Sequence, residues 1–190
     1  MKKIIIIIFI IALLGELVWG INYLFSKNTT QKTDKQGAKA DMEEIINVPN
    51  FSLTPKIGIY NMGSVFSVNL KIDSLNQGLS GADAILTYDK QLLEFVEIIP
   101  GKIFPFYPLR KNNIDKGEVS ITGTLTDPSQ SLFTGKGTFA TVKFRVLNVG
   151  ETKIKFDFTP GSTADSNLVE KKTGKDILET VINGSYTLIK

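Results

Sequence analysis

The chain has 190 residues, with 22 lysines and arginines against 19 aspartates and glutamates, and it contains neither cysteine nor histidine. The absence of both excludes disulfide bonds, cysteine–histidine zinc sites and catalysis by a serine–histidine–aspartate triad. The net charge of +3 is too small to indicate a nucleic-acid-binding surface. We therefore expect no nucleic acid partner and no cofactor.

The amino terminus is strongly apolar from residue 4 to residue 25, directly after Lys2 and Lys3. A helix of this length is about 33 Å long, enough to cross the hydrocarbon core of a bilayer. Basic residues before such a segment stay in the cytoplasm, so we expect a single-pass anchor in the cytoplasmic membrane with the rest of the chain outside. The alternative is a secretory signal peptide cleaved near residues 18–20, which would leave a secreted protein.

A polar segment of mixed charge follows at residues 26–50. It has too few apolar residues to offset the entropy that it would lose on ordering. We therefore divide the chain into an anchor or signal peptide (1–25), a flexible linker (26–50) and one globular domain (51–190).

The remaining residues alternate between short runs rich in β-formers and turns rich in glycine, proline, asparagine and aspartate. Many short strands at this spacing, with no helical period, indicate an antiparallel β-sandwich. The nine predicted strands are 51–59, 65–73, 82–88, 92–99, 117–125, 138–147, 152–158, 166–170 and 184–189.

Three of these strands alternate clearly between apolar and other residues. Side chains two apart in a strand lie on the same face, so each apolar set is expected to face the core. The predicted core positions are Ala82, Ala84, Leu86, Tyr88, Val119, Ile121, Gly123, Leu125, Ala140, Val142, Phe144 and Val146.

The run G-A-D-A-I-L-T-Y-D-K-Q-L-L-E-F-V at 81–96 resembles the cohesin domains of cellulosome scaffoldins. The blocks at 117–125, 135–146 and 164–172 follow in the order of that family, so the resemblance covers roughly residues 51–190. It implies a nine-stranded jelly-roll sandwich and a bacterial, extracellular, non-catalytic module of polysaccharide catabolism. The implied partner is a dockerin-like protein.

In cohesins one sheet face receives the dockerin, and an aspartate on the third strand is among its contacts. The resemblance places Asp83 at that position, whereas Gly81 stands where the family typically has asparagine. The other outward residues of the alternating strands complete the predicted partner-binding face: Asp83, Ile85, Thr87, Thr122, Thr141, Lys143 and Arg145. The alternative is an ordinary solvated sheet face, for which polar and β-branched residues are also typical.

Two further functions stay open, namely a carbohydrate-binding module and a structural domain of the cell envelope. Sugars stack on exposed aromatic rings, but the single tryptophan, Trp19, lies in the apolar leader. The cluster at 104–107 (F-P-F-Y) either forms a sugar platform or, as is more common, packs over the open end of the sandwich. The aspartates near loops lack the spacing of a calcium-binding loop, so we predict no metal site: Asp127, Asp157, Asp165 and Asp176.

Overall fold

The computed structural model describes residues 46–190, which belong to one compact unit, Ile45–Lys190. The predicted anchor at 4–25 and all but the last residues of the predicted linker lie outside the described residues. Within the described part, no helix has the length and apolar character needed to cross a bilayer.

The domain consists of strands joined by turns and loops. The strands are β1 (Asn50–Thr54), β2 (Ile57–Asn61), β3 (Val65–Asp73), β4 (Leu79–Thr87), β5 (Leu93–Pro100), β6 (Phe106–Asn113), β7 (Glu118–Thr124), β8 (Lys136–Val146), β9 (Gly150–Phe156), β10 (Asn167–Glu170), β11 (Thr180–Ile182) and β12 (Gly184–Ile189).

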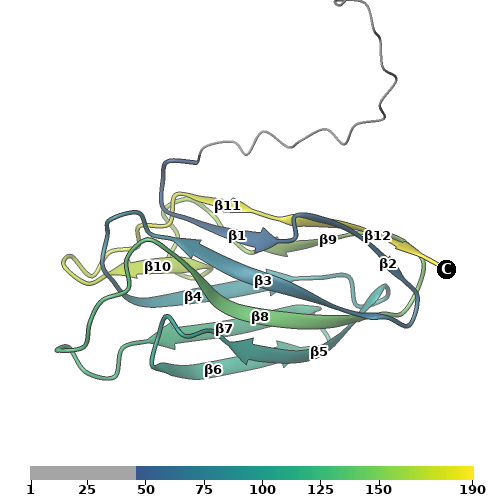
Figure 1. Ribbon diagram of the computed structural model, residues 1–190, viewed down its shortest axis with the longest axis horizontal. Coiled ribbons are helices and arrows are strands. Elements are labelled where there is room, and N and C mark those ends of the chain that lie inside the picture. Colours follow the sequence, from purple (N-terminus) through teal and green to yellow (C-terminus); the bar gives the residue numbers. More distant parts are fainter. Residues whose placement is uncertain (1–45) are drawn as a thin grey trace, which may run out of the picture. The chain divides into compact units, whose positions relative to one another are not determined.

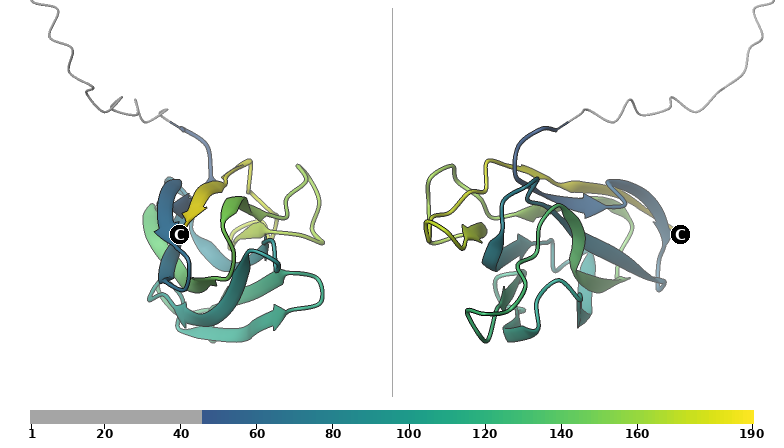
Figure 2. Two further views of the ribbon diagram at one scale, coloured as in Figure 1. Left: turned by 90° about the vertical axis from the view of Figure 1, so that its right-hand side faces the viewer. Right: turned by 60° about the vertical axis from the view of Figure 1, so that its left-hand side comes forward.

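Two sheets pack face to face as a sandwich (Figures 1 and 2). One has five strands in the order β11-β1-β3-β8-β5. The other has seven, in the order β2-β12-β9-β4-β7-β6 with β10 beside β4. Pairing is antiparallel except where β11 lies parallel to β1 and β2 lies parallel to β12. The predicted all-β sandwich is confirmed.

Residues 46–190 contain twelve strands instead of the predicted nine. The predicted strand 51–59 divides at Pro55 and Lys56 into β1 and β2, which join different sheets. Two further strands were not predicted: β6, an edge strand with five exposed residues out of eight, and β11, which has three residues. Neither carries the alternation of apolar residues that marks a half-buried strand.

The core lies between the sheets and is rich in aromatic rings. Phe51 of β1 is completely buried, and its ring centroid lies 5.7 Å from that of Phe139 of β8 and 5.1 Å from that of Phe156 of β9. The predicted core set is confirmed, since all its members are buried except Leu125, which is half-buried and packs against the core. The two-residue period of each strand is what separates these side chains from the exposed ones.

The aromatic cluster at 104–107 contributes to this core. Phe104 and Tyr107 are buried, and their ring centroids lie 6.0 and 5.4 Å from that of Phe139. The Tyr107 hydroxyl donates a 2.7 Å hydrogen bond to the Phe139 carbonyl oxygen. The packing interpretation of this cluster is therefore confirmed for these two rings, and Phe106 remains exposed.

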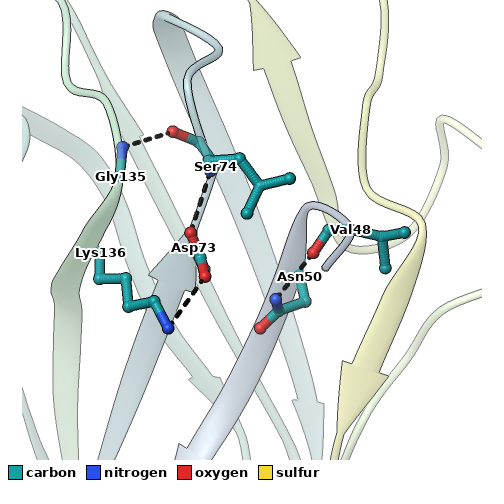
Figure 3. A network of polar contacts seen from close by, with 7 residues as sticks. Val48, Asn50, Asp73, Ser74, Gly135 and Lys136 are labelled. Atoms are coloured by element: carbon teal, nitrogen blue, oxygen red, sulfur yellow. Dashed lines mark hydrogen bonds and ion pairs between the residues drawn. The ribbon is translucent and has the colours of Figure 1, made fainter. Parts of the chain in front are cut away.

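Polar contacts join the end of β3 to the start of β8, beside the point where β1 begins (Figure 3). Asp73 is buried, and its carboxylate accepts the Leu75 N–H at 3.0 Å and pairs with the Lys136 ammonium at 3.4 Å. The Ser74 hydroxyl accepts the Gly135 N–H at 3.0 Å. Because a buried carboxylate needs such partners, these contacts satisfy Asp73 at the turn after β3.

Candidate functional site

Strand β4 supplies the first half of the candidate site. It pairs with β7 from Gly81 to Thr87, so Gly81, Asp83, Ile85 and Thr87 lie opposite Thr124, Thr122, Ser120 and Glu118. Opposite residues of an antiparallel pair point to the same face. Since the intervening residues of both strands are buried, these eight positions belong to the outer face of the seven-stranded sheet.

The other edge of β4 is held by the chain between β9 and β10. The Ile85 carbonyl oxygen accepts the Asp157 N–H at 2.8 Å, and the Ile85 N–H donates to the Ser166 hydroxyl at 3.0 Å. Beyond this point β10 takes over, with Asn167 opposite Asp83. Strand β4 is therefore held on both sides, and its outward side chains are presented by a rigid element.

Asp83 and Thr122 form the central contact of this face. The Thr122 hydroxyl donates a 2.5 Å hydrogen bond to Oδ1 of Asp83, and both side chains are half-buried. A carboxylate has two oxygens, each able to accept further hydrogen bonds. Asp83 is thus oriented by Thr122 and keeps acceptor capacity for an incoming donor.

A shallow depression of about 450 Å³ opens over Gly81, next to Asp83. Gly81 bears no side chain, and a Cβ atom there would lie 3.3 Å from the Gly123 carbonyl oxygen. Its polar lining consists of four hydroxyl groups, two carboxylates and one ammonium group, and the remaining lining residues are apolar or glycine. The lining includes Ser80, Asp83, Thr122, Thr124, Thr126, Asp127 and Lys171.

Two exposed apolar residues of β6 extend the face. Phe106 lies opposite Thr124 and is 48% exposed, and Leu109 lies opposite Thr122 and is 42% exposed. A shift in register between them turns Tyr107 inward. Phe106 and Leu109 were not predicted as site residues, because β6 was not predicted as a strand and no alternation assigned its side chains to a face.

The structure divides the seven predicted site residues between two sheets. Asp83, Ile85, Thr87 and Thr122 lie together on the face just described. The other three predicted residues lie on the outer face of the five-stranded sheet, because β8 pairs with β3 and β5: Thr141, Lys143 and Arg145. The expectation of one continuous face is therefore wrong, since alternation reveals which residues point outward but not which sheet holds a strand.

The three residues on β8 already have partners on neighbouring strands. The Thr141 hydroxyl donates to Oδ1 of Asn69 at 2.7 Å. Lys143 pairs with Glu97 at 2.7 Å, and the guanidinium of Arg145 donates to the Glu94 carboxylate at 2.6 Å. Cross-strand pairs of this kind stabilise a solvated sheet surface, which is the alternative that the sequence analysis left open.

Asp127 and Tyr107, both close to this face, have shifted pKa values. Hydrogen bonds from the Ser129 N–H and hydroxyl lower the pKa of Asp127, and burial raises the pKa of the Tyr107 hydroxyl to about 12. Among residues 46–190, no group of three or more acidic side chains lies close enough together to hold a metal ion. The arrangement is suited to hydrogen bonding and apolar contact with another molecule.

The fold is a two-sheet β-sandwich that exposes polar and apolar side chains together on the β4, β7 and β6 face. The cohesin domain profile matches residues 53–185, so the chain belongs to the cohesin domain family. A comparison with the sequences of curated proteins gave no match.

Solved structures of cohesins share the fold. The sixth cohesin of scaffoldin B from Acetivibrio cellulolyticus, solved with a mutant dockerin, has a TM-score of 0.61 and 21% identity, covering 74% of this chain and 99% of that one. CaCohA2 from Clostridium acetobutylicum has a TM-score of 0.60 and 16% identity, covering 75% and 91%. A type II cohesin domain from the cellulosome of A. cellulolyticus has a TM-score of 0.62 and 18% identity, covering 73% and 95%.

Proposed function

We propose that this domain is a non-catalytic module that binds a dockerin-like protein outside the cell, through the outer face of β4, β7 and β6. Cohesin domains are non-catalytic binding modules, and several of the similar structures are complexes with dockerins. The observation that carries the proposal is the Thr122–Asp83 hydrogen bond beside a hydroxyl-lined depression.

The chemistry of this face suits a protein partner. Protein interfaces combine apolar contacts with directional hydrogen bonds at a polar rim. Phe106 and Leu109 supply exposed apolar area, while Asp83 supplies an oriented acceptor. The neighbouring hydroxyl groups of Ser80 and Thr124 donate to backbone carbonyl oxygens and keep capacity to accept a hydrogen bond from a partner. A partner surface bearing hydroxyl or cationic donors is complementary to this arrangement.

Gly81 makes the proposed interface different from that of a typical cohesin. Asparagine at this position would place an amide where the depression now opens, and its Cβ would fit with a small shift of the Gly123 carbonyl. We propose that the partner fills this space with a side chain of its own. The partner is then a dockerin-like protein whose contact residues differ from those that recognise asparagine.

Two binding variants and one control test the proposed face. The partner is captured from the extracellular fraction of the source organism with residues 45–190, identified and purified. Isothermal titration calorimetry is expected to show at least about tenfold weaker binding for Asp83→Ala and for Thr122→Val, since a lost charge-assisted hydrogen bond is worth roughly 1.5–3 kcal/mol. Arg145→Ala, on the opposite sheet, is expected to bind like the wild type. Equal binding by all variants would refute the proposal.

Filling the depression provides an independent check of Gly81. Gly81→Asn leaves Asp83 in place but occupies the space beside it. We expect this variant to stay folded and to weaken binding of the natural partner. Unchanged affinity would show that the partner does not enter the depression.

Carbohydrate binding is the second candidate, favoured by a single observation. Phe106 is the one aromatic among the large exposed hydrophobic residues of 46–190, and it lies beside the hydroxyl-lined depression. One ring offers little stacking area for a polysaccharide, so the protein partner is preferred. Affinity electrophoresis in gels containing cell-wall polysaccharides distinguishes the two functions, because only a sugar-binding domain migrates more slowly in such gels. If the wild type is retarded, Phe106→Ala should abolish the retardation.

We also propose that residues 4–25 hold the domain at the outer surface of the cytoplasmic membrane. The support is the apolar run after Lys2 and Lys3. Carbonate extraction of membranes, followed by mass determination of the amino terminus, tests it. A shortened soluble chain that begins near residue 21 would replace the anchor by a cleaved signal peptide.

A further inference from the structure

The two sheets end in four strands with a free edge: β11 and β5 in one sheet, β2 and β6 in the other. A free edge strand invites pairing with another strand unless proline, charge, a bulge or short length prevents it. Strand β5 has a register shift, two glutamates and Pro100. Strand β6 has Pro108 and two basic residues, and β11 has three residues.

Strand β2 has none of these features. Its sequence, I-G-I-Y-N, contains no proline and no charge, and its pairing with β12 is regular over five residues. Ile57 and Ile59 point outward and are 69% and 67% exposed, the largest values among the exposed apolar residues of 46–190. Figure 1 shows β2 beside β12, near the C-terminus. The edge is therefore both apolar and open to pairing.

The backbone N–H and C=O groups of β2 that do not pair with β12 belong to the same two residues, Ile57 and Ile59. The Lys56 carbonyl oxygen accepts the Ser185 N–H at 2.8 Å, and the Met62 N–H donates to the Ile189 carbonyl oxygen at 2.7 Å. Backbone groups of successive strand residues point alternately to the two edges. Residues 56, 58, 60 and 62 thus face β12, whereas the N–H and C=O groups of Ile57 and Ile59 point away from it.

We propose that a second copy of this chain pairs with the first, antiparallel, through β2. The segment Ile57-Gly58-Ile59 reads the same in both directions. With Gly58 opposite Gly58 of the second copy, each Ile57 lies opposite Ile59 of the other copy. The two isoleucines then exchange both of their backbone hydrogen bonds, and every free backbone group at these residues finds a partner.

This symmetric register also suits the side chains. Ile57 and Ile59 of the two copies form apolar cross-strand pairs on the outer face, a type of pair that stabilises sheets. Gly58 lies on the axis, and a Cβ there would meet the Tyr60 ring at 2.7 Å. Because the strand is complementary to itself and carries no charge that would select another sequence, a second copy fits it better than an unrelated strand.

The twofold axis that relates two antiparallel strands is perpendicular to the plane of the sheet. The pairing therefore places the outer faces of the two copies on the same side of one continuous sheet. Strand β6 is at the opposite edge of the sheet, so the Asp83 face stays free in both copies. This consequence rests on the proposed function: the dimer would present two recognition faces in one direction and gain avidity for a repeated partner.

Charge variants at the two isoleucines test the register. Sedimentation equilibrium of residues 45–190 is expected to show a concentration-dependent dimer. The double variant Ile57→Lys and Ile59→Lys places like charges opposite each other and should raise the dimer dissociation constant at least about tenfold. The matched variant Ile57→Glu and Ile59→Lys places opposite charges in the same pairs and should restore dimerisation.

Cross-linking of the full chain supplies a second measurement, because the chain has no cysteine of its own. Ile57→Cys should give a cross-linked dimer with a short bis-maleimide. Ile114→Cys should not, because Ile114, which is 62% exposed, lies in the turn after β6 and away from β2. A wild-type chain that stays monomeric at millimolar concentration, or a dimer that both lysine substitutions leave unchanged, would overturn the proposal. Binding of the partner at the Asp83 face is measured separately, so failure of either proposal is distinguishable from failure of the other.

Discussion

The outer faces of the two sheets are built from similar residues but differ in how those residues are paired. On the β3, β8 and β5 face, Lys143 and Arg145 form ion pairs with glutamates directly opposite them on β5. On the β4, β7 and β6 face, Asp83 accepts one short hydrogen bond from Thr122 and lies beside a depression and two exposed apolar residues. The first face satisfies its own charges, whereas the second retains capacity for a partner.

This difference shows that an outward polar residue indicates function only when its neighbours leave it available. Exposed ion pairs contribute little to stability, and a partner would have to break them before it could use either charge. A carboxylate held by a neutral hydroxyl keeps its full charge for recognition. This contrast supports the proposed recognition role of Asp83 over one for Lys143 and Arg145, whose charges are already paired.

The largest expected effect concerns the core beneath the β8 face. Phe144 lies between Lys143 and Arg145 in sequence but is completely buried, with its ring centroid 5.1 Å from that of Tyr88. Phe144→Ala should lower the free energy of unfolding by about 3–5 kcal/mol, because it leaves a cavity. Urea unfolding of residues 45–190 measures this change. A loss below about 1 kcal/mol would mean that inward and outward residues of β8 are reversed.

The next effect concerns the core beneath the β4 and β7 face. A Cβ atom on Gly123 would lie 2.7 Å from ring atoms of Phe104 and Phe139. Gly123→Ala should therefore destabilise the domain by roughly 1–3 kcal/mol through overpacking. Gly81→Ala is the matched control, since its Cβ meets nothing closer than 3.3 Å. Equal losses in the two variants would contradict the assignment of Gly123 to the inner face and Gly81 to the outer face.

A smaller effect, dependent on pH, concerns the residue that anchors β6. Burial raises the pKa of the Tyr107 hydroxyl from 10.0 to about 12. The folded state therefore holds this proton more tightly than the unfolded state, so its contribution to stability is complete below pH 10 and is lost as the pH rises toward 12. Tyr107→Phe also removes the hydrogen bond to Phe139, which should cost about 1 kcal/mol at pH 7.

Urea unfolding of the wild type and of Tyr107→Phe at about pH 7, 9 and 11 measures this effect. The first two values lie below the ordinary tyrosine pKa of about 10, and the third lies between that value and the pKa in the folded state. The difference in stability between the two proteins should shrink at the highest pH. A difference that is the same at all three values would show that the hydroxyl titrates normally in the folded state.

The smallest effect is expected for the ion pairs of the β8 face. Arg145→Ala and Lys143→Ala should each change the free energy of unfolding by less than about 1 kcal/mol, because exposed pairs are screened by solvent. A double-mutant cycle of Arg145→Ala with Glu94→Ala isolates the interaction. A coupling energy above about 2 kcal/mol would make this face a structural network and weaken the contrast with the Asp83 face.

Much of the fold was predictable from local patterns in the sequence. The strand predicted at 65–73 matches β3 residue for residue, and the alternation around Val142 and Phe144 correctly separated core from surface. The block at 81–96 also led to the family that the comparison confirms. Each of these results depends on neighbouring residues along one strand, where the two-residue period decides which side chains are buried.

Only the tertiary structure decided which strands share a sheet. The pattern at 138–147 is the same whether β8 lies beside β7 or, as it does, between β3 and β5, so Lys143 and Arg145 were assigned to the wrong face. Strands β6 and β11 carry little alternation because they lie at sheet edges. The physical reason is that the polarity of each side chain determines which residues are buried. Strand pairing depends instead on backbone hydrogen bonds between distant segments, and every residue type offers the same backbone groups except proline, which lacks the N–H.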